Sequence, residues 1–477
     1  MRHPDLIRPL LSISPNILRL GFVLAALVLL GCVPNLFAQP TLRPPATVVR
    51  AGPKVIPFFT TESDPQQLAI LRELIAEYQR LNPNVEVDIV LASPASRGRR
   101  LLTALASGAD LGIFEIEPML MPNWVSAGYL LPLDDIVRDI GASDFADGSL
   151  FQYDGRVYAL PYAVSVYGLW VRTDLLQSAG LGLPQNYADV LTAAKTLTRG
   201  GIYGIALPGG QNIATLNYFS TFLWQNGGDY FNCDGKVTFG EPAALEAIRR
   251  WQALSQHAPP GFTTWDYREQ IDAYLKGQVA MAMYAGRLGV QLDETNPKLA
   301  ERTTVIFPPW GQVKVTLGVW SRFGIAAGTR YQKEAKDFLR WLLSGDRLYR
   351  YDMVMPGHMI PPLRSVRAMP LENTSPYAQR HRDWIQSFYD WSSYANHPAM
   401  NMGSIRDGRF ERSATVPPWV QEVLGTPGII DTMLQEIGLR GKSPEQAWQD
   451  AARKLEQATS AWRAAHPGWV PPKCGTP

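Results

Sequence analysis

Cysteine and charge are the two scarcest features of this 477-residue sequence. Three cysteines exclude a scaffold built from disulfides and any zinc site with four cysteine ligands. Charged residues make up only 18% of the chain, and 45 Lys plus Arg against 43 Asp plus Glu leave a net charge of +2. A chain this close to neutral lacks the concentrated basic field of a general nucleic-acid binder.

Several signatures of catalysis are also missing. The sequence has no GxxxxGK[ST] phosphate loop, no GxSxG nucleophile elbow and no HExxH zinc motif. Its six histidines show no spacing typical of metal ligands. We therefore expect no metal and no cofactor. A pair of carboxylates that hydrolyses glycosides is not excluded by the sequence, because such pairs follow no fixed spacing.

The remaining composition indicates a large folded protein. Hydrophobic residues make up 46% of the chain, with 14 Trp, which excludes a disordered chain. The length is about three times that of a typical domain of about 150 residues, so at least two domains are expected.

The N-terminus is typical of an export signal. Basic residues precede Gly21–Leu30, an apolar run that is too short to cross a bilayer as a helix. The run ends in Leu-Leu-Gly-Cys, which resembles a bacterial lipobox with Cys32 as the lipid-modified residue. We predict a lipoprotein signal peptide over 1–31 and a proline-rich tether over 32–53. Ordinary secretion with cleavage after Ala38, or an uncleaved anchor, are the alternatives.

Export also allows the other cysteines to pair. Cys233 and Cys474 are the thiols that remain after lipidation, and an oxidising compartment permits a disulfide between them. Two unpaired thiols are the alternative.

Periodicity predicts alternating strands and helices at the start of the mature chain. Lys54–Phe59, Val85–Leu91 and Ala109–Ile116 are predicted strands, and Gln66–Leu81 and Arg97–Ser107 are predicted helices. This order favours a largely parallel sheet with right-handed crossovers. Later segments with helical spacing are Tyr187–Leu197, Pro242–Ser255, Tyr267–Lys276, Tyr331–Leu343 and Ser443–Ala464.

The order of local motifs resembles the extracellular solute-binding proteins of ABC importers, in the sugar-binding group similar to maltose-binding protein. The similar segments are Leu74–Val87 (LIAEYQRLNPNVEV), Leu102–Asp110 (LTALASGAD), Trp124–Asp135 (WVSAGYLLPLDD), Asp154–Pro161 (DGRVYALP), Leu169–Gly180 (LWVRTDLLQSAG), Pro184–Leu197, Lys276–Met281 (KGQVAM) and Ser443–Ala452. Each segment is weakly specific, but their order and spacing over nearly the whole mature chain are typical of that family.

The resemblance implies an α/β, two-lobed periplasmic-binding-protein fold (type II-like), with a hinge and a ligand cleft between the lobes. It implies one lobe over 54–154 plus 303–364, a second over 155–301 plus 371–462, and a tail over 463–477. The expected function is capture of a small carbohydrate or sugar-like solute (sugar, polyol or glycoside) by hinge closure. The expected partners are ABC permease subunits with a separate ATPase. The expected location is the periplasm or the outer face of the cytoplasmic membrane, with membrane contact through the lipid anchor and no nucleic acid.

Aromatic rings match the apolar faces of a sugar, and carboxylates, amides and arginines match its hydroxyls. On this basis and on the resemblance, we predict ligand contacts from residues of the expected cleft. Each has a structural alternative: helix capping or a solvated loop for the acids, core packing for the aromatic residues and an ion pair for the arginines. The predicted ligand-binding residues are Glu62, Glu115, Glu117, Tyr162, Ser165, Tyr167, Trp265, Asp266, Tyr284, Arg287, Trp320, Arg364 and Trp391.

Two departures from the family bear on the ligand. Ser165 stands where maltose-binding protein has a ligand-binding glutamate, which argues against maltose. Arg287 stands where the family commonly has tryptophan, which favours a charged or heavily hydroxylated ligand. Two other functions fit the sequence: a secreted glycoside-acting enzyme, and a lipoprotein of this fold that senses ligand without transport.

Overall fold

The structure is a computed structural model that describes residues 52–62, 64–91, 101–153, 155–371, 375–399, 405–406, 408–411 and 418–471. The predicted lipid site Cys32, the signal peptide, most of the tether and Cys474 lie outside these residues. Within them, no helix is both long enough and apolar enough to cross a membrane.

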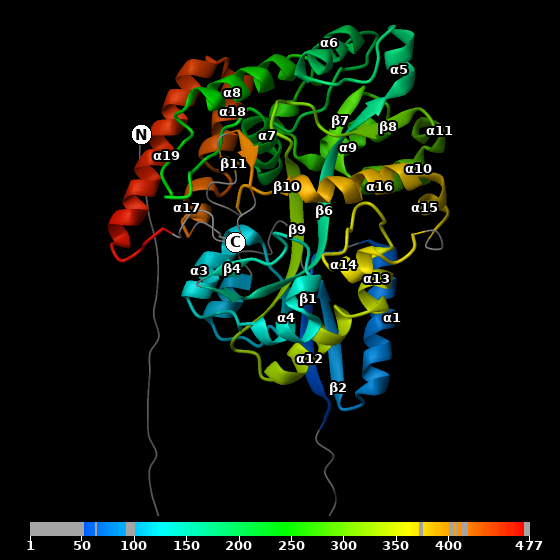
Figure 1. The fold of residues 1–477 in the computed structure, drawn as a ribbon, viewed down its shortest axis with the longest axis vertical. Coiled ribbons are helices and arrows are strands. Elements are labelled where there is room, and N and C mark those ends of the chain that lie inside the picture. Colours follow the sequence, from blue (N-terminus) through cyan, green and yellow to red (C-terminus); the bar gives the residue numbers. More distant parts are fainter. Residues whose placement is uncertain are drawn as a thin grey trace, which may run out of the picture. The chain divides into compact units, whose positions relative to one another are not determined.

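One large sheet organises the fold (Figure 1), with the strand order β2-β1-β3-β9-β6-β7. The strands are β1 (Lys54–Thr60), β2 (Val85–Leu91), β3 (Ile113–Glu115), β6 (Ala159–Arg172), β7 (Met281–Ala285), β8 (Thr303–Ile306), β9 (Thr316–Ile325) and β10 (Ala395–Asn396). β8 pairs with β6, and β10 pairs with β9. Short hairpins form from β4 (Gln152–Tyr153) with β5 (Arg156–Val157) and from β11 (Ile405–Arg406) with β12 (Arg409–Phe410).

The two longest strands, β6 and β9, run antiparallel and each has different neighbours at its two ends. Residues 159–166 of β6 pair with β9, whereas residues 167–171 pair with β7 and residues 169–172 pair with β8. β9 pairs with β3 near its end and with β10 at its start. All residues of β6 are buried, which fits a strand covered on both faces.

The prediction of a largely parallel sheet is right for one part and wrong for the other. β1 is parallel to β2 and to β3, as the strand–helix–strand order predicts. β9 is antiparallel to β3 and β6, and β6 is antiparallel to β7 and β8. The reversal arises because β6 and β9 join distant parts of the chain, where no local crossover rule applies. β8 pairs with the same end of β6 as β7 does. The predicted lobe boundary at residue 303 instead assigns β8 to the lobe that contains β1–β3.

A first group of helices packs on the β2-β1-β3 end of the sheet. α1 (Pro65–Leu81) begins at Asp64, whose carboxylate accepts from the backbone N–H groups of Gln66 and Gln67. Its apolar face shares a core with the strand residues Ile56 and Phe58. The other helical segments between β2 and β6, and those that follow β9, are η1 (Pro118–Leu120), α3 (Met121–Ser126), α4 (Asp134–Ile140), η2 (Ala142–Asp144), α12 (Gln332–Leu342), α13 (Asp346–Asp352) and α14 (Arg364–Arg367).

A second group surrounds β7 and β8, and α7, α8, α18 and α19 contact one another there (Figure 1). α7 is buried at nearly every position, as expected for a helix enclosed by others. The helices after β6 are α5 (Thr173–Ser178), α6 (Tyr187–Leu197), α7 (Ile213–Gln225), α8 (Pro242–Ser255), η3 (Phe262–Thr264), α9 (Tyr267–Leu275), α10 (Arg287–Thr295) and α11 (Pro297–Ala300). Those nearer the C-terminus are α15 (Pro376–Arg380), α16 (Arg382–Trp391), η4 (Ser392–Tyr394), α17 (Val420–Leu424), α18 (Ile429–Arg440) and α19 (Pro444–Ala465).

Aromatic packing holds the end of the chain against the loop that carries Cys233. The ring of Trp419 lies 5.3 Å from that of Trp462 and 4.8 Å from that of Trp469, between ring centroids. Arg463 Nη2 donates to the carbonyl of Asp234 at 2.6 Å. Cys233 is disulfide-bonded, and its pairing with Cys474 stays a prediction.

A buried acid stands out in the β2-β1-β3 part. Asp352, the last residue of α13, is 0% exposed, and neither of its carboxylate oxygens has a hydrogen-bond partner. Burial raises the pKa of Asp352 well above its ordinary value. A carboxyl without partners is unfavourable to ionise in such surroundings.

We expect Asp352→Asn to stabilise the protein increasingly as the pH rises. Above pH of about 4 the unfolded chain releases the Asp352 proton while the folded chain keeps it, so the wild type loses stability with rising pH and the variant does not. The difference in unfolding free energy should grow by about 1.4 kcal/mol per pH unit until the folded carboxyl ionises. Urea unfolding at several pH values measures it. Asp346→Asn on the same helix is the control, because that side chain is 67% exposed, and equal pH profiles for the two variants would contradict the prediction.

Candidate functional site

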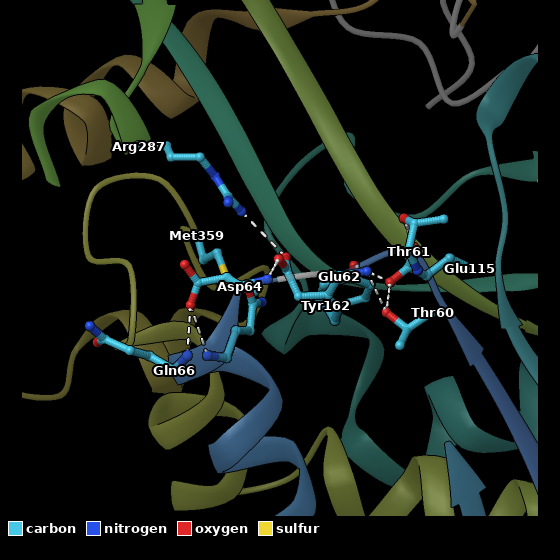
Figure 2. A network of polar contacts seen from close by, with 10 residues as sticks. Thr60, Thr61, Glu62, Asp64, Gln66, Glu115, Tyr162, Arg287 and Met359 are labelled. Carbon is cyan, nitrogen blue, oxygen red and sulfur yellow. Dashed lines mark hydrogen bonds and ion pairs between the residues drawn. The ribbon is translucent and has the colours of Figure 1, made fainter. Parts of the chain in front are cut away.

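The candidate site begins where β1 and β3 end, at the carboxylate of Glu115. This carboxylate is buried and accepts hydrogen bonds from Thr60 Oγ1 at 2.5 Å and from Thr61 Oγ1 at 2.5 Å. The backbone N–H of Thr61 donates at 3.1 Å, and the Tyr162 hydroxyl lies 3.4 Å away (Figure 2). Glu115 therefore fixes the loop after β1 to the end of β3.

The same loop presents Glu62. The backbone N–H of Glu62 donates to Thr60 Oγ1 at 3.0 Å, and Glu62 Oε1 accepts from the Asp64 N–H at 2.8 Å. Glu62 Oε2 lies 3.3 Å from Arg287 Nη2, and the two side chains are 15% and 23% exposed. Figure 2 shows the guanidinium of Arg287 directed at this carboxylate from the opposite side of the site.

Arg287 is positioned by a close backbone approach. It is the first residue of α10 and follows Gly286 at the end of β7. A Cβ on Gly286 would lie 2.4 Å from the carbonyl oxygen of Gly357 and 2.6 Å from the nitrogen of His358. Only glycine fits at this position, because backbone atoms cannot move aside as a flexible side chain can.

A cluster of tyrosines lies on the β7 side of the same region. Tyr167 on β6 packs edge-on against Tyr218 on α7 at 5.7 Å and against Tyr284 on β7 at 5.3 Å, between ring centroids. Tyr284 stacks with Tyr267 on α9 at 6.4 Å and with the ring of His358 at 6.5 Å. Five segments of the chain thus contribute rings to one cluster.

The hydroxyls of this cluster differ in their partners. The Tyr218 hydroxyl donates to the carbonyl of Met283, and Gln270 Nε2 donates to the same carbonyl at 3.0 Å. In the described part of the chain, the hydroxyls of Tyr167 and Tyr284 form no hydrogen bond. These two groups are available to a ligand.

Burial keeps the cluster uncharged. It raises the pKa of Tyr284 to about 12 and also raises the pKa values of Tyr167 and Tyr218 well above their ordinary value, so all three stay protonated at neutral pH. Burial, with the charge of Arg287 as a smaller cause, lowers the pKa of His358 well below its ordinary value, so that ring is neutral. Neutral donors and acceptors therefore adjoin the Glu62–Arg287 ion pair.

Glu117 lies apart from this network, on a cavity of about 630 Å³. The cavity is lined by Glu117, Met119 and Leu120 from the β3 end, by Ile213 at the start of α7, and by residues 421–432 and Lys454. Asn123 on α3 donates to Gln421 and Glu422 at 3.0 Å each beside it. The cavity is thus lined by residues from both helix groups.

The structure places the predicted site residues in several environments. It brings together Glu62, Glu115, Tyr162, Tyr167, Tyr284 and Arg287 around the region just described. Tyr162 also stacks on Phe323 at 4.1 Å between ring centroids, and Ser165 lies on β6 opposite Val319.

The remaining predicted residues have structural partners. Asp266 caps α9 in a capping box with Glu269, and the Trp265 carbonyl accepts from Asn212 Nδ2 at 3.0 Å. Trp320 is 3% exposed and packs near Phe151. Trp391 packs against Phe307 and Phe388, and Arg364 pairs with Asp147 at 2.7 Å.

Sequence reasoning missed Tyr218, Tyr267, Gln270 and His358. Tyr218 and Gln270 lie within ordinary helical patterns, and no local signal distinguishes them from core residues. His358 follows Gly357 in the connection between α13 and α14, where no local sequence pattern marks a functional residue. In the described ranges, no group of three or more His, Cys, Asp or Glu side chains is arranged to hold a metal ion.

Known proteins with similar sequences and folds are binding proteins. The family described as "Bacterial extracellular solute-binding protein" matches residues 62–346. A putative ABC transporter periplasmic-binding protein of Escherichia coli is 26% identical over 331 residues, 65% of this chain and 74% of its own. A diacetylchitobiose-binding protein of Streptomyces coelicolor is 25% identical over 374 residues, 75% of this chain and 78% of its own.

Solved structures share the fold. Maltose-bound T. maritima MalE3 aligns with a TM-score of 0.69 at 19% identity and covers 84% of this chain and 99% of its own. The predicted α/β, two-lobed architecture is thereby confirmed.

We expect a double-mutant cycle to detect coupling between Glu62 and Arg287. With Glu62→Gln and Arg287→Gln, the coupling in unfolding free energy should be about 1 kcal/mol or more, because both side chains are largely buried. The control pair is Arg249 and Glu445, which are 52% and 47% exposed at 2.8 Å. Its coupling should be smaller, and a value equal to that of the Glu62–Arg287 pair would contradict the assignment.

Proposed function

We propose a transport function for this chain, which belongs to the bacterial extracellular solute-binding protein family. In this proposal the chain is the solute-binding subunit of an ABC importer and captures a small, hydroxyl-rich, sugar-like molecule. The observation that carries it is the cluster of neutral tyrosines beside the Glu62–Arg287 pair.

The chemistry of the cluster favours an uncharged, hydroxylated ligand. Tyrosine rings match the apolar C–H faces of a sugar, and the free hydroxyls of Tyr167 and Tyr284 bond to sugar hydroxyls. Glu62 and Arg287 offer acceptors and donors whose charges cancel. The names of relatives point the same way, since one is a diacetylchitobiose-binding protein. Ser165 in place of an acid argues against maltose itself.

Capture by closure suits the position of these groups. Glu62 and Glu115 belong to the β1–β3 part, whereas Tyr167, Tyr284 and Arg287 belong to the part around β7. A solute that contacts both parts favours the arrangement in which they are close. A shift from mostly open to mostly closed needs about 5.5 kcal/mol of differential binding, which stacked rings and several hydrogen bonds supply.

We propose no catalytic role. Glu115 accepts hydrogen bonds from two threonines and Glu62 pairs with an arginine, so both carboxylates already have structural partners. The alternative of a secreted glycoside-acting enzyme would be supported by hydrolysis of a glycoside by the purified chain. Uptake of the solute by a strain that lacks this protein distinguishes a transport receptor from one that only senses the solute.

The remaining parts of the proposal concern location and partners. Cys32 is the proposed lipid attachment point that holds the protein at the outer face of the cytoplasmic membrane or in the periplasm. The proposed partners are permease subunits, which receive the solute, and a separate ATPase.

We expect a hydroxylated solute to raise the melting temperature of the purified chain. The solutes to be tested are sugars, polyols and glycerophosphodiesters. A solute that binds the folded state stabilises it by mass action. Tyr284→Phe should weaken binding about fivefold, the effect of about 1 kcal/mol for one lost hydrogen bond. Tyr153→Phe is the control, because that hydroxyl contacts Ser126 at the surface. No stabilisation by any solute would count against the receptor function.

We expect Cys32 to carry the lipid. Cells that express the chain should incorporate radiolabelled palmitate into it, and Cys32→Ala should abolish the label, because this cysteine ends the lipobox. Cys233→Ala is the control and should keep the label. Incorporation that survives Cys32→Ala would refute the anchor.

A further inference from the structure

A second cavity, separate from the candidate solute site, gathers cationic side chains. Its volume is about 470 Å³, and it shares no lining residue with the cavity beside Glu117. The side chains that line it include Lys314, Arg364, Arg367 and Arg409, with Asp147 as the one carboxylate among the described lining residues.

Three of these four cations lack an acidic partner. Arg364 pairs with Asp147 at 2.7 Å. Throughout the residues that the structure describes, Lys314, Arg367 and Arg409 form no ion pair. Lys314 Nζ instead lies 4.3 Å from the centroid of the Tyr394 ring. The cavity therefore holds an excess of positive charge.

Arg367 is the deepest of these groups and is only partly satisfied. Its Nη1 donates to Ser392 Oγ at 3.0 Å and its Nε donates to the carbonyl of Pro361, both neutral acceptors. A guanidinium carries more N–H donors than these two acceptors use, in a planar fork that suits an oxyanion. Burial lowers the pKa of Arg367, which is the sign of a cation that lacks compensation.

The buried acid Asp352 does not compensate the positive charge of Arg367. Asp352 interacts with Arg367 electrostatically but neither of its oxygens has a hydrogen-bond partner. Its raised pKa favours the neutral carboxyl, so Asp352 offsets the charge of Arg367 weakly. An external anion in the cavity meets a smaller desolvation cost than a fully buried carboxylate, because Arg364, Lys314 and Arg409 are exposed.

We propose that this cavity is a second binding site for a soluble polyvalent oxyanion, of the phosphate or polycarboxylate class. Arg367 and Arg364 bind it from α14, Lys314 from the segment before β9 and Arg409 from β12. Ser392 and Ser393 also line the cavity, but their hydroxyls already donate to the backbone carbonyls of Tyr389 and Asp390, so the four cations carry the binding. The site is independent of the proposed solute function: it uses neither the tyrosine cluster nor the Glu62–Arg287 pair, although it includes Arg364 from the predicted ligand-binding residues.

Calorimetric titration with inorganic phosphate, and separately with citrate, tests the site at constant ionic strength set by sodium chloride. Saturable binding is expected, and Lys314→Gln with Arg409→Gln should weaken it at least tenfold. The control is Lys298→Gln with Arg330→Gln, which removes the same charge from exposed positions outside the cavity. No saturable binding of either anion, or equal weakening in the control, would overturn the proposal.

A chemical readout locates the anion without depending on altered residues. Phosphate should slow the acetylation of Lys314 several-fold, measured by peptide mass spectrometry, and leave that of Lys298 unchanged. Equal rates at Lys314 with and without phosphate would refute the site. The thermal response to solutes should persist in the Lys314→Gln, Arg409→Gln variant, so failure of one site is distinguishable from failure of the other.

Discussion

The antiparallel pairing of β6 with β9 is the constraint on which the positions of the candidate site residues depend. Both strands are buried, so their backbone groups must be satisfied by each other and by the strands beside them. The register shifts between Pro161 and Ala163, where proline has no N–H to donate, and such an irregularity bends a strand. Beyond it, Tyr162 and Tyr167 point to different sides of β6, one toward Phe323 and the other toward the tyrosine cluster.

The site residues on either side of this strand pair are held in fixed positions. On the β1–β3 side, Glu115 is buried and hydrogen-bonded by both threonines, so the loop that carries Glu62 has little freedom. On the other side, the contact between Gly286 and Gly357 leaves no space for a side chain and fixes the start of α10. Two rigid supports are therefore joined by an ion pair of 3.3 Å between flexible side chains. The Glu62–Arg287 contact can therefore adjust while the loop after β1 and the start of α10 stay in place.

The sequence predicts local features well and long-range ones poorly. α6 and α8 have the predicted bounds, because helical periodicity is a short-range property. The capping role of Asp266 follows from the Glu three residues later. The antiparallel strands and the tyrosine cluster were not predictable, since residues 167, 218, 267 and 284 meet only once the topology is known. Likewise, the position of Glu115 was predicted, but its bonds to Thr60 and Thr61 depend on the alignment of β1 with β3.

The distribution of charge in this nearly neutral chain matches the two kinds of ligand proposed for it. The net charge of +2 combines a proposed solute site, where Glu62 and the buried Glu115 lie near Arg287, with a cavity where four cations face one acid among the described lining residues. A charged solute at the first site would lose its hydration beside an ion pair that is already balanced, which is unfavourable. A neutral sugar loses only hydrogen bonds, and the tyrosine hydroxyls replace them. The cavity beside Arg367 instead favours an anion. The guanidinium of Arg367 donates to only two neutral acceptors, so an oxyanion there can accept hydrogen bonds from its remaining N–H groups.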